Sequence, residues 1–359
     1  MRSKYTKSLF SQKLSVVQHN VITFPSVFET AYGNTQNAAK DLLNGLKIKK
    51  NETWYLVGNM ARRNAINAGR VVNAAPDEED FDILFRAAMV NVLSKVQQPF
   101  TVTVGLPLST YNVYKHAAGQ HLSRRHFMIE HDTATFNVNG GVKKNTFEVD
   151  AYDVIPEIVG GIIGLKKVHA PDLTKNFIAI SFGFGTVEGG FATNDGLVHR
   201  TCFSSHGIRY VTNNLARELN TQYFLDMKNE HQMDEAFLNG SLFTNRRRID
   251  LKELKRTLLE QYYREVISPL IRKHFADSDL EHCSKIYLMG GGANYRELTD
   301  LVAEEFKDFI PVEVVPNPET VASLGYLYNS LRVSDNNPAR CIGLDLGNAT
   351  TSVSIFEQG

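Results

Sequence analysis

Residues 341–356, CIGLDLGNATTSVSIF, decide the fold of this chain. They predict an apolar strand that runs into Asp345, a tight turn at Gly347-Asn348, and a second strand with alternating side chains. A carboxylate at a strand end can hold a hydrated Mg²⁺ ion, and small residues after it let backbone N–H groups approach a phosphate. The stretch therefore predicts a phosphate-binding hairpin, with an ordinary β-turn and a solvent-facing aspartate as the alternative.

A second stretch repeats the pattern. Residues 179–186, AISFGFGT, match residues 343–350, GLDLGNAT, as an apolar strand, a turn that contains glycine and threonine, and an outgoing strand. Two similar hairpins suggest two related halves with a ligand in the cleft between them. The candidate phosphate-binding residues are Asp345, Gly347, Asn348, Thr350 and Thr351 in one hairpin and Gly183, Phe184, Gly185 and Thr186 in the other.

Two further segments carry candidate chemistry. Residues 287–294, YLMGGGAN, put Gly290, Gly291, Gly292 and Ala293 between a buried strand and a helix, which leaves room for a flat group against the backbone. Glu157 follows Ile155-Pro156 at a strand end, where a carboxylate can orient an attacking water. The alternatives are a flexible strand-to-helix turn and an acid favoured by the helix dipole alone.

Composition sets the outer limits. The chain has 359 residues, of which 43% are hydrophobic, enough for two domains. Lys+Arg 39 balances Asp+Glu 39, so we expect no direct binding to bulk nucleic acid. Three scattered cysteines fit a reducing cytoplasm better than disulfides or a zinc site, and no apolar run is long enough for a transmembrane segment. The basic start, residues 1–14, is expected to be a frayed tail, with a membrane-surface helix as the alternative.

Periodicity predicts an α/β fold with helices covering sheets. Small residues at Ala322 and Gly325 predict close packing of one helix against another. Strands are expected at residues 16–24, 54–57, 100–104, 147–152, 177–182 and 286–289, helices at 80–97 and 252–274, and a hairpin around 139–141.

Together these segments resemble the actin superfamily. DLGNATT resembles its first phosphate loop, ISFGFGTVEGGF its second, YLMGGGANYREL its adenosine motif, and VIPE and NPETVASLGYLY its two connecting segments. FPSVFETAYG, YLVGNMARR and VGLPLSTY look most like ParM-type plasmid-segregation actins and related archaeal actin-like proteins. The resemblance implies an actin-like (ribonuclease-H-like) two-domain fold with ATP or ADP and Mg²⁺ in the cleft.

The order of the motifs is cyclic. The family begins with the first phosphate loop, whereas this chain puts it last, so the fold is expected to be circularly permuted. The last hairpin would pair with the strand around residues 16–24, which brings the two ends of the chain together. Domain I is expected to hold residues 1–153 and 317–359, and domain II residues 154–316.

The resemblance implies a cytoplasmic ATPase that polymerises into a filament of itself and moves plasmid DNA through a DNA-binding adaptor. Asp345 would hold Mg²⁺ through water, and Glu157 would orient the attacking water. Ser181 stands where the family's second phosphate loop usually has aspartate, so hydrolysis is expected to be slow. The alternatives are a non-filament scaffold of the FtsA or pilus-assembly type, disfavoured because the chain ends in a core hairpin without an anchor, and a small-molecule kinase.

Overall fold

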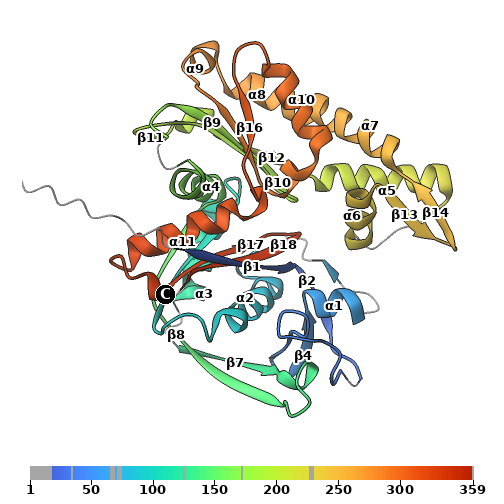
Figure 1. Cartoon of the computed structure of the whole chain (residues 1–359), viewed down its shortest axis with the longest axis vertical. Helices are drawn as coiled ribbons and strands as arrows, with labels where there is room; N and C mark the ends of the chain where they lie inside the picture. Colours follow the sequence, from blue (N-terminus) through green and yellow to red (C-terminus); the bar gives the residue numbers. More distant parts are fainter. Residues whose placement is uncertain are drawn as a thin grey trace, which may run out of the picture.

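The hairpin at the end of the chain lies inside the larger of two main sheets, next to its edge strand β1 (Figure 1). In the computed structural model, β17 (Cys341–Leu346) and β18 (Thr350–Phe356) pair antiparallel. β18 pairs antiparallel with β1 (His19–Pro25), and β17 pairs parallel with β6 (Phe100–Leu106). The predicted pairing of the last hairpin with the first strand is therefore confirmed.

The structure describes residues 18–33, 35–64, 69–70, 75–123, 126–170, 173–225 and 230–357. The larger sheet has ten strands in the order β1-β18-β17-β6-β8-β7-β3-β4-β2-β5. The strands not yet placed are β8 (Val142–Pro156), β7 (His126–Asp132), β3 (Lys47–Lys50), β4 (Thr53–Val57), β2 (Val27–Thr30) and β5 (Gly69–Arg70). The turn between β7 and β8 contains Asn139 and Gly140, where a hairpin was predicted.

The second sheet repeats the strand arrangement β1-β18-β17-β6 of the first. Its hairpin, β9 (Phe177–Phe182) and β10 (Thr186–Thr193), pairs with β12 (Phe203–His206) through β10 and with β15 (Ile286–Met289) through β9. β16 (Val312–Val314) and β11 (Gly196–Leu197) lie at its edges. Thus β12 occupies the place of β1, and β15 that of β6. Along the chain, the hairpin β9–β10 comes before its partner strand β12. The hairpin β17–β18 comes after its partner strand β1.

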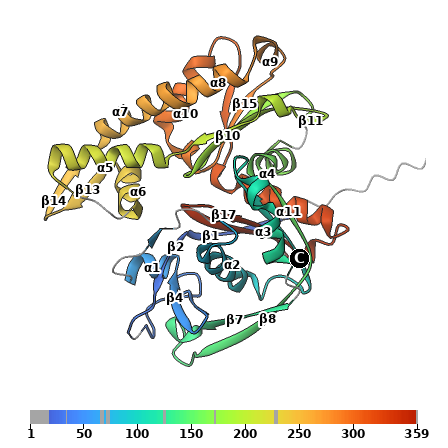
Figure 2. The same ribbon diagram turned by 180° about the vertical axis from the view of Figure 1, so that it is seen from behind.

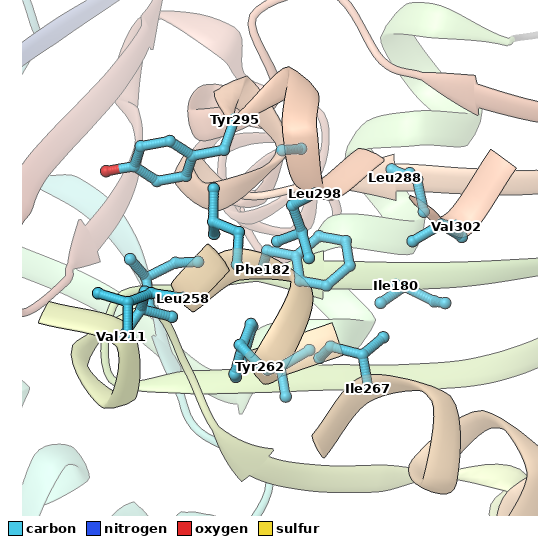
Figure 3. Close-up of a cluster of buried hydrophobic side chains, with 14 of the residues drawn as sticks. Ile180, Phe182, Val211, Leu258, Tyr262, Ile267, Leu288, Tyr295, Leu298 and Val302 are labelled. Carbon is cyan, nitrogen blue, oxygen red and sulfur yellow. The ribbon is translucent and has the colours of Figure 1, made fainter. Parts of the chain in front are cut away.

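Helices cover both sheets and enclose separate apolar cores, the second of which is seen close up in Figure 3. α2 packs on one face of the first sheet, and α11 covers the other (Figures 1 and 2). The predicted helix over 252–274 is present, interrupted by a π-helical turn at Tyr263–Ile267. The α-helices are α1 (Asn59–Asn64), α2 (Glu79–Val92), α3 (Tyr111–Leu122), α4 (Glu157–Gly164), α5 (Arg209–Tyr223), α6 (Glu230–Asn239), α7 (Lys252–Tyr262), α8 (Ser268–His274), α9 (Asp277–Glu281), α10 (Arg296–Phe306) and α11 (Val321–Val333).

Some segments differ from the sequence-based expectations. The helix expected over 80–97 ends earlier, at Val92. α3, α5, α6 and the small hairpin β13 (Ser241–Thr244) with β14 (Arg247–Asp250) were not predicted. Residues 1–17, including the basic start, lie outside the described residues. In the part of the chain that the structure describes, no helix is both long and apolar enough to cross a membrane.

Helices α4 and α11 cross between the two sheets (Figure 1). A Cβ atom on Gly325 would overlap the carbonyl oxygen of Gly160, and one on Gly164 would overlap that of Val321. The two backbones therefore touch, as the small residue at 325 predicted. Because β16 leads into α11 and β8 leads into α4, the two chain connections between the sheets are packed against each other.

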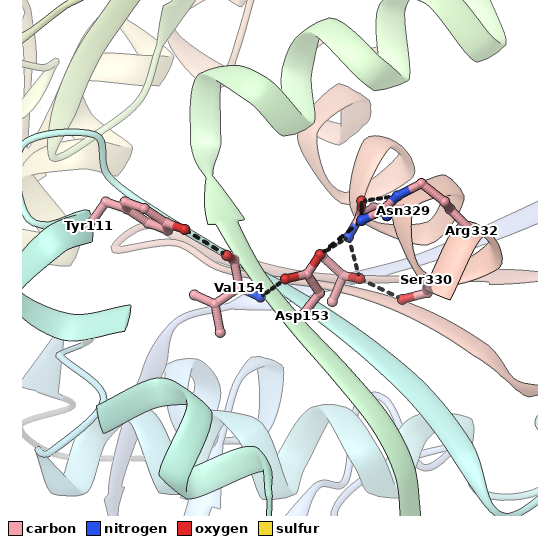
Figure 4. Close-up of polar contacts among 7 residues, drawn as sticks. Tyr111, Asp153, Val154, Asn329, Ser330 and Arg332 are labelled. Atoms are coloured by element: carbon pink, nitrogen blue, oxygen red, sulfur yellow. Dashed lines mark hydrogen bonds and ion pairs between the residues drawn. The ribbon is translucent and has the colours of Figure 1, made fainter. Parts of the chain in front are cut away.

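A polar network fastens α11 to the first sheet (Figure 4). The Asn329 amide donates to Thr103 Oγ1 at 3.1 Å and to Asp153 Oδ2 at 2.9 Å. Ser330 Oγ donates to the carbonyl oxygen of Ile342 in β17 at 2.7 Å. Since buried polar groups are costly when unpaired, these bonds fix the helix in one position over the hairpin strands.

The helix crossing gives a stability prediction. We expect Gly325→Ala to destabilise the protein by about 1–3 kcal/mol, because the added methyl forces α4 and α11 apart despite the higher helix propensity of alanine. Gly141→Ala is the control, since a Cβ there meets nothing within 4 Å; its effect should stay within about 0.5 kcal/mol. Urea unfolding of both variants measures the difference, and equal midpoints would contradict the close crossing.

Candidate functional site

A cavity of about 290 Å³ lies between the turns of the two hairpins. Its walls come from both sheets, from α4 and α11, and from α6 at its outer end. The lining residues are Pro107, Glu157, Ser181, Gly183, Phe184, Gly185, Thr186, Ile208, Asp234, Leu238, Met289, Gly290, Gly291, Gly292, Asn294, Tyr295, Pro318, Glu319, Ala322, Asp345, Gly347, Asn348, Ala349 and Thr350. A second hollow of about 470 Å³ continues behind it and shares Glu157, Gly185 and Asn348.

The two turns face each other across the cavity. A Cβ atom on Gly185 would lie 2.5 Å from Asn348 Oδ1, so the turn after β9 and the turn after β17 are in contact. A side chain at position 185 would push them apart. The absence of one there lets the two backbones approach each other at the cavity.

The turn after β17 is braced by Ser26, which follows β1. Ser26 is fully buried, and its N–H donates to the carbonyl oxygen of Ala349 at 2.9 Å. Its hydroxyl donates to the carbonyl oxygen of Gly347 at 2.5 Å and lies 2.9 Å from Thr351 Oγ1. With these carbonyl groups occupied, the turn keeps one shape, which a phosphate-binding backbone requires.

The turn after β9 is braced in the same way. The N–H groups of Gly207, Ile208 and Arg209 donate to the carbonyl oxygens of Gly185, Gly183 and Phe184, respectively, at 2.8–3.1 Å. The bond from Gly207 to Gly185 corresponds to the bond from Ser26 to Ala349. The repeat recognised in the sequence is thus a repeat of hydrogen-bonded structure, including the residue after the third strand of each sheet.

The triple glycine forms another wall. Gly290 has φ +82°, a left-handed conformation that favours glycine, and its N–H donates to the carbonyl oxygen of Pro318 at 2.8 Å. A Cβ atom on Gly291 would meet nothing within 4 Å, so this glycine opens onto free space. The wall is flat backbone of the kind that a planar ring can lie against.

Three carboxyl groups lie near one another at the cavity: Glu157 and Asp345 are half-buried and line it, and Glu188 is buried beside them. Burial raises the pKa of Asp345 and of Glu188 to about 7. Burial, followed by the charges of Glu188 and Asp345, raises the pKa of Glu157 well above its usual value. Their raised pKa values mean that the ionised forms of these acids are destabilised in the protein alone. A bound cation would stabilise the ionised forms.

Sequence reasoning missed Glu188. It is 1% exposed, and its carboxylate accepts from Leu108 N at 2.6 Å, from Ile158 N at 3.2 Å and from Ser204 Oγ at 3.1 Å. It thereby joins the loop after β6, the start of α4 and strand β12. The sequence repeat contained a signal for this residue. In β9–β10, Ser181 lies opposite Glu188, and in β17–β18, Asp345 lies opposite Ser352. The acid is therefore on the second strand of one hairpin and on the first strand of the other.

The lining suits Mg²⁺ held partly by other groups. No three His, Cys, Asp or Glu side chains among the described residues converge as a metal-binding group, and no Lys or Arg is among the residues that line the cavity. Mg²⁺ usually keeps several waters and binds through one or two carboxylates and substrate phosphates. Asp345 fits such a shared site as a ligand of the cation, and backbone N–H groups of both turns could bind the phosphates. Because no basic side chain lines the cavity, the cation would supply the positive charge that offsets a polyphosphate.

Most of the predicted site residues line the cavity, and two do not. Thr351 is fully buried, because alternate residues of β18 point to opposite faces and its hydroxyl is taken by Ser26. Ala293 is 3% exposed and packs in the apolar core behind the glycines. The side chains of these two residues therefore do not line the cavity, and their part in nucleotide binding stays a prediction.

Comparison with known proteins agrees with this geometry. The family described as "Actin like proteins N terminal domain" matches residues 4–160. The solved structure of Ta0583, an archaeal actin homologue, superposes with a TM-score of 0.67 at 16% identity, covering 86% of this chain and 92% of that one. The chain therefore shares the fold of this actin homologue, and the family model matches its first 160 residues only.

Two further solved structures are similar in fold. A non-polymerisable pCBH ParM mutant gives a TM-score of 0.70 at 18% identity, with 86% of this chain and 92% of that chain covered. MreB5 of Spiroplasma citri, solved with ADP, gives 0.57 at 12% identity, with 81% and 91% covered. No curated protein matches the sequence. The actin-like fold expected from the motifs is confirmed.

The buried acids predict a dependence of stability on pH. Because the pKa of Glu188 is raised to about 7, the folded protein keeps a proton that the unfolded chain releases between about pH 4 and about pH 7. The group therefore lowers stability as pH rises through this range and adds no further change above it. In nucleotide-free protein, we expect Glu188→Gln to flatten this fall in the free energy of unfolding.

Calorimetry of both proteins across the range measures the effect, and Glu253→Gln on the exposed face of α7 is the control. A Glu188→Gln slope equal to that of the parent protein would show that Glu188 titrates normally.

Proposed function

We propose that this protein is an actin-like ATPase that binds ATP with Mg²⁺ and assembles into filaments of itself. The observation that carries the proposal is the pair of braced turns in contact at a cavity, which is lined by the acids Glu157 and Asp345 and by a flat glycine wall. Solved relatives of similar fold include a ParM filament from Clostridium botulinum, at a TM-score of 0.68, and the Alp12 filament, at 0.51.

Each residue has a distinct part in this proposal. The turns at Gly347–Ala349 and Gly183–Gly185 would bind the phosphates through backbone N–H groups, and the glycines at 290–292 would lie against the base. Asp345 would hold the Mg²⁺ ion through water. The ion, when bound, offsets charge on the phosphates. Glu157 would orient the attacking water and receive its proton. Glu188, held by Leu108 and Ile158, would fix the start of α4, where Glu157 lies.

We also propose that the chain is a circular permutation of the family's usual order. Support comes from the two halves of this molecule, since β12 follows its hairpin whereas β1 precedes the matching one. The N–H of Glu357 donates to the carbonyl oxygen of Gln18 at 2.8 Å, so the end of β18 lies beside the start of β1. A short link there would restore the order seen in the second sheet. The two-domain division at residues 153–154 and 316–317 belongs to the same proposal.

The cellular role follows the filament. We propose that the filament moves plasmid or other DNA, with a separate DNA-binding adaptor, because the chain has no net charge with which to hold bulk DNA itself.

Assembly with nucleotide tests the function. Protein with ATP and Mg²⁺ should pellet and show filaments by electron microscopy, while protein with EDTA should stay in the supernatant. Asp345→Asn should weaken Mg²⁺-ATP binding by about 10- to 100-fold without unfolding the protein, because the neutral amide suits the buried position. Release of free phosphate would indicate an ATPase, and a phosphorylated acceptor would indicate a kinase. Nucleotide binding without pelleting would indicate a scaffold.

The position of Ser181 predicts a slow enzyme. A neutral hydroxyl cannot hold a magnesium-bound water electrostatically as a carboxylate does. We expect Ser181→Asp to raise the rate of phosphate release by about tenfold or more. Ser352→Asp in the other hairpin is the matched control and should not raise it, since Ser352 is buried opposite Asp345. An unchanged rate in Ser181→Asp would count against this role for position 181.

A further inference from the structure

Tyr326 of α11 occupies a slot made by two glycines. Its side chain is fully buried, yet it belongs to none of the apolar clusters of the described residues. A Cβ atom on Gly105, in β6, would overlap the Tyr326 hydroxyl, and one on Gly160, in α4, would overlap its ring. The ring is therefore held between backbone segments of both connections and of the first sheet, and it has no room to turn away.

The hydroxyl of Tyr326 has no hydrogen-bond partner among the described residues. A buried hydroxyl left unpaired costs about 1–3 kcal/mol, so such a group in a well-packed structure calls for an explanation. Burial first, and then the charges of Asp345, Glu157 and Glu188, raise the pKa of Tyr326 well above its usual value. The phenol thus stays a neutral O–H donor, near three acceptors that it does not touch.

One water molecule would satisfy the hydrogen-bonding groups of this site. A water can accept the hydrogen bond of the phenol and donate its two hydrogens to two carboxylate oxygens, so it satisfies every group in such a site. Buried waters in proteins make about three hydrogen bonds of this kind to otherwise unpaired polar groups. If the phenol donated directly to one carboxylate, the other acids would gain no hydrogen bond from it. If no group lay between them, the phenol and the acids would be desolvated without a partner.

We propose that Tyr326 is a positioning residue whose hydroxyl binds a fixed water that donates to Asp345 and Glu157. The water orients the Glu157 carboxylate, and through it the attacking water of the proposed hydrolysis. This catalytic role rests on the proposed ATPase function, whereas the water site itself does not.

Tyr326→Phe distinguishes the effect of the hydroxyl from that of the ring. Phenylalanine keeps the ring in the glycine slot and removes an unpaired group, so the melting temperature should not fall. The dissociation constant of an ATP analogue and the KM for ATP should stay within about twofold, while kcat should fall by about tenfold or more, the usual size of a lost orienting contact. Unchanged kcat, or a loss of stability and of nucleotide binding alongside kcat, would overturn the positioning role.

A matched control is Tyr262→Phe. Tyr262 is equally buried, but its hydroxyl donates to the carbonyl oxygen of His206 at 2.7 Å. Its loss should lower stability by about 1 kcal/mol and leave kcat unchanged. Tyr326→Phe should lower kcat but not stability, whereas Tyr262→Phe should lower stability but not kcat. This contrast distinguishes a positioning hydroxyl from a structural one.

A crystal structure of the nucleotide-free protein, at a resolution that shows waters, tests the site without reference to activity. Density for a water within hydrogen-bond distance of Tyr326 Oη and of both carboxylates supports the proposal, and its absence overturns it. If the parent protein hydrolyses no ATP, the proposed function and the catalytic role of Tyr326 both fail, while the density still decides whether the water is bound.

Discussion

The structure depends on one pairing: the hairpin β17–β18 lies between the edge strand β1 and strand β6 of the larger sheet. Both neighbours are far away along the chain, so the sheet closes only when the end of the chain returns to its beginning. The same step completes the site, because the turn after β17 then meets the turn after β9 at Asn348 and Gly185. The larger sheet and the cavity therefore both depend on the same strand pairing.

The second constraint is the crossing of α4 and α11. Backbone contact at Gly160 and Gly325 ties the two chain connections together, and the Asn329 network fixes α11 to the first sheet. Glu188 adds a link from the second sheet to α4. These contacts therefore connect the two turns to both sheets.

The sequence was most informative where a local pattern determines the backbone. Alternating apolar residues and glycine turns predicted both hairpins and the strand before Gly290. Side-chain direction was harder to predict: Thr350 and Thr351 are adjacent hydroxyls, yet the alternation of a strand sends one to the cavity and the other to Ser26. Glu188 and Tyr326 escaped notice because each lies in an otherwise apolar segment and gains its meaning only from residues distant in sequence.

The central claim is that the two braced turns hold a triphosphate between them, with the metal at Asp345. The most direct test is a crystal structure of the full chain with Mg²⁺ and a non-hydrolysable ATP analogue. The account predicts phosphate oxygens at hydrogen-bond distance from backbone N–H groups of both turns, the base against the glycines at 290–292, and Asp345 within one water of the metal. A nucleotide bound to one turn only, or bound elsewhere on the molecule, would contradict it.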